Sequence, residues 1–209
     1  ADPTNGNTTL VAAPTSVVAD GSTTSSVTVT LADASGNLLT ASGGTVALSS
    51  TGSATIGAVT DNGDGTYTAT VTNTVAESVT ISGTLDGAAI TDTATVTFTV
   101  GAADPTNGNT TLVAAPTSVV ADGATTSSVT VTLADANGNL LTASGGTVAL
   151  SSTGSATIGA VTDNGNGTYT ATVTNTVAES VTISGTLDGA AITDTATINF
   201  TVGAADRTN

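Results

Sequence analysis

Valine and leucine alternate with serine and threonine in the segment Ser26-Val27-Thr28-Val29-Thr30-Leu31. A period of two residues places the apolar side chains on one face of an extended strand and the hydroxyl side chains on the other. The segment therefore predicts a β-strand with one buried face and one solvated face. The same segment recurs at residues 128–133, so the prediction applies twice.

This recurrence extends over the whole chain. Residues 1–102 return as residues 103–204, and five of the 102 paired positions differ. The differing pairs are Ser22/Ala124, Ser35/Asn137, Asp64/Asn166, Val96/Ile198 and Thr97/Asn199. An internal period determines architecture, so we expect two domains of the same strand order, at 1–102 and 103–204. Residues 205–209 repeat the first residues of each copy, with arginine in place of proline, and predict the start of a further repeat or a tail.

Further alternating segments bring the expected total to about seven strands per copy. In the first copy their inward residues are Val46 and Leu48, then Tyr67, Ala69 and Val71, then Val79, Ile81 and Leu85, and finally Ala94, Val96, Phe98 and Val100. Asp86-Gly87 fits a two-residue hairpin, and Pro14 splits the first strand as in an edge strand that changes sheets. About seven short antiparallel strands in roughly 100 residues predict an all-β, two-sheet sandwich in each copy.

The charge balance excludes several classes of protein. The chain has 16 acidic residues, one basic residue and no histidine, for a formal net charge of −15. Binding of nucleic acid requires clustered Lys and Arg, so we expect no nucleic-acid partner. No segment approaches the roughly 18 apolar residues of a spanning helix, so we expect no membrane insertion within this chain. Cysteine is absent, which excludes disulfides and thiolate metal sites.

Catalysis is not expected from this composition. Without His, Cys or Lys, the usual general bases and thiol nucleophiles are missing and a serine triad cannot be assembled. Carboxylate pairs remain, but they lie on expected turns rather than in a cleft lined by aromatic rings. We predict that the chain is not an enzyme.

Three motifs of each copy resemble a known group of domains. They are residues 18–21, 26–37 and 65–69, repeated at 120–123, 128–139 and 167–171. Together they resemble the bacterial immunoglobulin-like domains of the invasin and intimin group, over essentially the whole chain. This resemblance implies two tandem immunoglobulin-like β-sandwiches that serve as spacer repeats in the stalk of a large bacterial surface adhesin and project a distal binding domain.

The same resemblance implies an extracellular location at the bacterial cell surface. It also implies a monomeric rod whose partners are neighbouring repeats of the same chain. The high acidity fits a saline exterior, and it equally fits a halophilic intracellular protein.

A ligand-binding module for glycans or host proteins is the alternative interpretation. Such sites usually present aromatic anchors or arginines. The chain has two Tyr, two Phe and one basic residue, and all four aromatic residues fall on expected inward positions. We therefore favour a spacer over a binding module.

Calcium is the one cofactor that the acidic loops indicate. Alternate loops of a sandwich collect at opposite ends, and carboxylates crowded at one end repel unless they are solvated or bridged by a divalent ion. The candidate ligands at the N-terminal ends of the two copies are Asp2, Asp33, Asp61, Asp64 and Asp86, and then Asp104, Asp135, Asp163 and Asp188. Plain solvation of exposed loops is the alternative.

Two places make the calcium hypothesis specific. Asp61-Asn62-Gly63-Asp64-Gly65 resembles part of a calcium loop, and the alternative is an ordinary β-turn before the strand at Tyr67. Asp104 lies in an expected linker at 99–109. We expect the Asp20 turn and the Glu77 loop of the first copy to contribute to a calcium site at this junction. Some very large adhesins with similar repeats bind calcium at domain junctions, so the resemblance implies such a site.

Overall fold

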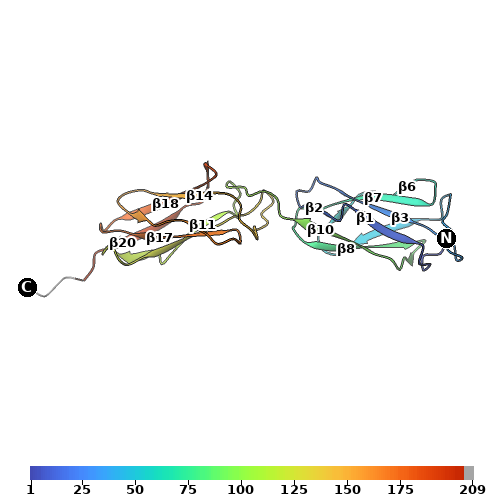
Figure 1. The fold of residues 1–209 in the computed structure, drawn as a ribbon, viewed down its shortest axis with the longest axis horizontal. Helices are drawn as coiled ribbons and strands as arrows, with labels where there is room; N and C mark the ends of the chain where they lie inside the picture. The colour runs from blue at the N-terminus through green and yellow to red at the C-terminus, as the bar shows by residue number, and fades with distance from the viewer. Residues whose placement is uncertain (205–209) are drawn as a thin grey trace, which may run out of the picture. The chain divides into compact units, whose positions relative to one another are not determined.

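The computed structural model describes residues 1–204, which form two compact units (Figure 1). The first unit is Ala1–Gly101 and the second begins at Ala102. The predicted start of a further repeat, at 205–209, lies outside the described residues. Within the described range the regular elements are all β-strands, and no helix long and apolar enough to cross a membrane is found there.

The first unit is a sandwich of two sheets. One sheet has the order β1-β3-β7-β5, and β6 also pairs with β7. The other has the order β2-β10-β8-β4, and β9 also pairs with β8. The strands are β1 Thr9–Ala13, β2 Ser16–Val18, β3 Ser25–Thr30, β4 Val46–Ser50, β5 Thr55–Ile56, β6 Thr60–Asp61, β7 Thr66–Thr72, β8 Ser78–Leu85, β9 Ala88–Ala89 and β10 Ala94–Thr99.

The second unit repeats this arrangement strand for strand. Its sheets have the orders β11-β13-β17-β15, with β16 on β17, and β12-β20-β18-β14, with β19 on β18. The strands are β11 Thr111–Ala115, β12 Ser118–Val120, β13 Ser127–Thr132, β14 Val148–Ser152, β15 Thr157–Ile158, β16 Thr162–Asp163, β17 Thr168–Thr174, β18 Ser180–Leu187, β19 Ala190–Ala191 and β20 Ala196–Thr201. The prediction of two all-β, immunoglobulin-like sandwiches of one strand order is confirmed.

Each unit has its own apolar core between its sheets. Val27, Val29 and Leu31 of the opening segment are all fully buried. The ring of Tyr67 on β7 and the ring of Phe98 on β10 pack into the same core. Their counterparts lie in the separate core of the second unit. The alternation of Val with Thr therefore places the apolar half of each strand inside, as predicted.

The first strand changes sheets at Pro14, as the sequence predicts. Before it, β1 pairs antiparallel with β3, with Leu10 opposite Val29. After the cis Ala13–Pro14 peptide, β2 pairs parallel with β10, with Ser16 opposite Thr97. One short segment thus contributes an edge strand to each sheet.

The predicted two-residue hairpin is also present. Leu85 at the end of β8 pairs with Ala88 at the start of β9. The two residues between them, Asp86 and Gly87, have φ angles of 49° and 84°. Positive φ at both central positions is the geometry of a type I′ turn, which matches the right-handed twist of the strands.

Candidate functional site

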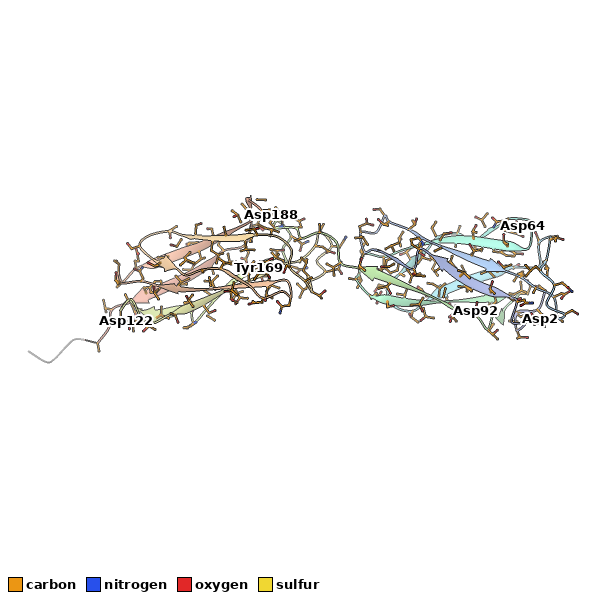
Figure 2. The ribbon with its side chains drawn as sticks, viewed as in Figure 1. Asp2, Asp64, Asp92, Asp122, Tyr169 and Asp188 are labelled. Carbon is orange, nitrogen blue, oxygen red and sulfur yellow. The ribbon has the colours of Figure 1, made fainter. Side chains whose placement is uncertain are left out.

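The N-terminal turn of each unit packs on the loop that carries Asp33 or Asp135. In the first unit the amide of Asp2 donates to the carbonyl of Ala32 at 2.7 Å, and Asn7 Nδ2 donates to the carbonyl of Gly36 at 2.8 Å. The buried hydroxyl of Thr8 donates to the Asp2 carbonyl and accepts from the Ala32 amide. These bonds bring the Asp2 and Asp33 loops together at the end of the unit where Figure 2 labels Asp2 and Asp64.

A second pair of candidate aspartates flanks the segment at Gly44 and Thr45. Asp86 Oδ1 accepts from the amide of Thr45 at 2.7 Å. The hydroxyl of Tyr67 donates to the carbonyl of Gly44 at 2.7 Å. Asp61 and Tyr67 line a shallow hollow of about 220 Å³ beside this segment. The second unit has an equivalent hollow, lined by Asp163 and Tyr169.

Most of the candidate carboxylates are hydrogen-bonded to their own loops. Asp33 Oδ1 accepts from the amides of Ser35 and Asn37, both at 2.9 Å. Asp64 Oδ1 accepts from the amide and the hydroxyl of Thr66, at 3.0 and 2.6 Å. Hydrogen bonds to the charged form lower the pKa of a carboxyl group. The Asn37 side chain accordingly lowers the pKa of Asp33, and the Thr66 hydroxyl lowers the pKa of Asp64.

The remaining candidates also accept hydrogen bonds from backbone amides. Hydrogen bonds lower the pKa of Asp2 and Asp104 mainly through the threonine hydroxyl two residues on. The amide donors, with their distances to the carboxylate, are Thr4 to Asp2 at 2.9 Å, Gly63 to Asp61 at 2.9 Å, Thr106 to Asp104 at 2.8 Å, Asn137 to Asp135 at 2.9 Å, Gly165 to Asp163 at 2.8 Å and Thr147 to Asp188 at 2.7 Å. Asp188 thus bonds a segment 41 residues away in sequence, whereas each of the other aspartates holds the turn in which it lies.

Asp104 belongs to the second unit rather than to a free linker. Its amide donates to the carbonyl of Ala134 at 2.8 Å, as the amide of Asp2 does to Ala32 in the first unit. Ala103 forms a β-bridge with Asp135, whose side chain is buried. The expected linker at 99–109 is therefore mostly structured, because β10 ends at Thr99 and the fold of the second unit includes Ala103 and the residues after it.

A metal site would need several of these carboxylates to converge. Among residues 1–204, no three acidic side chains form a group that could hold a metal ion. Apart from those of Asp86 and Asp188, the observed hydrogen bonds are those of Asp in tight turns, where its side chain bonds the backbone two residues on. Calcium binding remains a prediction.

The opposite end of the first unit joins the Asp20 turn to the loop around Glu77. The amide of Gly21 donates to the carbonyl of Asn73 at 2.9 Å, and Asn73 Nδ2 donates to Glu77 Oε1 at 2.9 Å. Asp20 accepts from the amide and hydroxyl of Thr23, each at 2.6 Å, and the pKa of Asp20 is lowered. Figure 2 labels Asp122, the matching residue of the second unit. Hydrogen bonds from Thr125 lower its pKa to about 2.

Asp92 is a structural carboxylate that the sequence did not reveal. Its Oδ2 accepts from the amide of Leu10 on the edge strand β1 at 2.9 Å, and Asp194 does the same for Leu112 at 2.8 Å. Asp92 lies between two threonines with no glycine beside it. The sequence therefore has no turn signal at Asp92, and a single charged residue between threonines is the only feature that could have indicated its role.

Both copies match a known family in sequence. Residues 4–101 and residues 106–203 each match the family described as invasin, domain 3. The chain belongs to this family. The predicted relationship to the invasin and intimin group is thereby confirmed, and the two units are tandem invasin domain 3 repeats.

Three solved structures resemble these invasin domain 3 repeats. InvD of Yersinia pseudotuberculosis is 33% identical over 97% of this chain and 60% of its own, with a TM-score of 0.61. Invasin, described as a bacterial integrin-binding protein, is 31% identical over 93% of this chain and 40% of its own, with a TM-score of 0.62. FdeC, an Escherichia coli adhesin, is 26% identical over 98% of this chain and 66% of its own, with a TM-score of 0.64. The chain thus spans 60% and 40% of the lengths of the first two proteins.

Proposed function

We propose that the two repeats are non-catalytic spacers of a bacterial surface adhesin, which hold a distal binding domain away from the cell. The observation that carries this proposal is the position of the aromatic side chains. The chain has two Tyr and two Phe, and all four, Tyr67, Phe98, Tyr169 and Phe200, are buried in the cores. An interface anchored by aromatic side chains needs them at the surface. FdeC, an adhesin with a similar structure, supports the same function.

The proposed spacer works through repetition. Each repeat buries its own core, so stability is local and further copies add length without changing the fold. The longest strand, β8, has 8 residues and spans about 26 Å at about 3.3 Å per residue, and the loops at both ends bring a repeat to roughly 40 Å. We propose that such repeats, joined in series, form a monomeric rod outside the cell.

Length per copy is the quantity that tests the spacer proposal. We would measure small-angle scattering of proteins with one, two and four copies. A spacer predicts that the maximum dimension rises by a constant increment of about 40 Å per copy. A compact particle at four copies would contradict it. Saturable binding of the two-copy protein to glycans or to host cells would instead favour the ligand-binding alternative.

We also propose calcium as the counter-ion of the acidic loops. The net charge of −15 and the single basic residue support this, because little within the chain can neutralise the carboxylates. The test is calcium titration by calorimetry on the wild type and on Asp104→Ala, with scattering recorded in calcium and in chelator. No heat, and profiles unchanged by chelator, would leave Asp104 as a turn residue without a metal.

A further inference from the structure

One of the five differences between the copies changes the chemistry of an exposed loop. Asp64 of the first copy is replaced by Asn166 in the second. Both side chains accept through Oδ1 from the amide and the hydroxyl of the threonine two residues on. The distances are 3.0 and 2.6 Å for Asp64, and 3.1 and 2.7 Å for Asn166. The loop therefore has the same hydrogen bonds with an aspartate or an asparagine.

Asparagine followed by glycine is the pair most open to intramolecular attack by the backbone. The amide nitrogen of Gly167 can bond to Cγ of Asn166 while it loses its proton. The bond from Cγ to Nδ2 then breaks, and Nδ2 leaves with a proton as ammonia, which gives a five-membered succinimide. Water opens this ring to aspartate or isoaspartate. Water is the one co-reactant, and Gly167 has no Cβ to obstruct the approach.

The hydrogen bonds at Asn166 favour each part of this reaction. Negative charge develops on Oδ1 as Gly167 attacks, and the two donors of Thr168 already point at that oxygen, as in an oxyanion hole. Within the described residues, the amide of Gly167 donates no hydrogen bond and Nδ2 of Asn166 donates none. Neither the attacking amide nor the leaving amide therefore has to break a hydrogen bond before it reacts.

Other asparagine-glycine pairs in the chain lack one of these features. The attacking amide is held in three of them, because Gly63 donates to Asp61 at 2.9 Å, Gly165 to Asp163 at 2.8 Å and Gly138 to the Asp135 carbonyl at 3.0 Å. The leaving amide is held in two more. Asn107 Nδ2 donates to the carbonyl of Ala136 at 3.0 Å, and Asn5 Nδ2 donates to that of Ala34 at 3.4 Å.

We propose that Asn166 is a site of spontaneous deamidation and the fastest-reacting asparagine of the folded chain. The aspartate product restores the residue of the first copy and adds one negative charge to the loop. The isoaspartate product lengthens the backbone beside Gly167, which is buried and closely approached by the carbonyl of Leu141. This second product therefore disrupts the turn, whereas the first preserves it.

The experiment follows the purified chain at mildly alkaline pH. Anion-exchange chromatography separates the charge variants, and peptide mass spectrometry locates the change. We expect the first acidic variant to carry its change at position 166. Asn166→Asp should lose this first phase, and Thr168→Val should slow it about fivefold by removing one donor to Oδ1.

The first copy supplies a matched gain-of-site control. Asp64→Asn places the same pair in the same loop, so it should create a second site that reacts at the rate of Asn166. In denaturant all the asparagine-glycine pairs should react at similar rates, because the preference for Asn166 comes from the fold. Reaction at Asn62 or Asn164 as fast as at Asn166 in the folded protein would overturn the proposal, as would an unreactive Asp64→Asn. Thermal melting of each variant confirms that it is folded.

Discussion

Truncation of one core valine should destabilise one repeat and leave the stability of the other unchanged. Val29 on β3 is fully buried and lies opposite Leu10 on β1 and Tyr67 on β7. Val29→Ala removes two methyl groups, and each costs about 0.8 kcal/mol in lost burial. A residual cavity of about 50 Å³ adds about 1.2 kcal/mol. The free energy of unfolding of the first unit should therefore fall by about 3 kcal/mol.

Differential scanning calorimetry checks this expectation. The wild-type units have nearly the same sequence and should melt together, whereas Val29→Ala should split off a transition about 12 to 24 °C lower. Val131→Ala is the matched variant in the second unit and should give the same profile. The double variant should again melt in one region, at the lower temperature. A single transition in either single variant would show that the two cores unfold as one unit and would refute the reasoning.

Three further predictions concern the loops. Asp92→Ala leaves an amide of the edge strand β1 without its acceptor and should cost the first unit about 1 to 2 kcal/mol in urea unfolding; an unchanged midpoint would contradict this. Gly65→Ala forces a side chain into positive φ and against the carbonyl of Leu39, so it should cost about 3 kcal/mol or more. Gly63→Ala, at positive φ in open space, should cost about 1 kcal/mol. An equal loss of unfolding free energy in the two variants would be evidence against the contact with the Leu39 carbonyl. The folded pKa of Asp122 is lowered to about 2, so its stabilising effect is complete above pH ~4 and is lost as pH falls toward 2. Asp122→Asn should therefore reduce the fall in melting temperature between these pH values, and a fall equal to that of the wild type would contradict this.

Much of the fold was predictable because the signals are local and strong. Alternation of Val with Thr identified the long strands, and Asp86-Gly87 identified a hairpin. The strands β5, β6 and β9 were not predicted as separate elements. Each has two residues, which is too short for a period of two to be recognised. They explain why each sandwich has more strands than the expected seven.

The candidate site was less predictable than the fold. The sequence indicates that Asp and Gly form turns, but the partners of Glu77, Asp86 and Asp92 depend on how segments distant in the chain meet. Glu77, for example, accepts from the amide of Ser53 at 2.6 Å, across 24 residues of sequence. Thr8 is a threonine among many, yet its hydroxyl is buried and joins Asp2 to Ala32. Contacts of this kind come from tertiary packing and leave no local pattern.

The parallel pairing of β2 with β10 has a mechanical consequence. Val17 lies opposite Phe98 in this pair, which joins the beginning of the first unit to its last strand. Tension applied to the two ends of the unit pulls β2 by its N-terminal side and β10 by its C-terminal side, in opposite directions along parallel strands. The ladder is then loaded in shear, so its hydrogen bonds must break together instead of one after another. Because forced unfolding depends on the rate of barrier crossing, a repeat of modest equilibrium stability can still withstand a pull along its length.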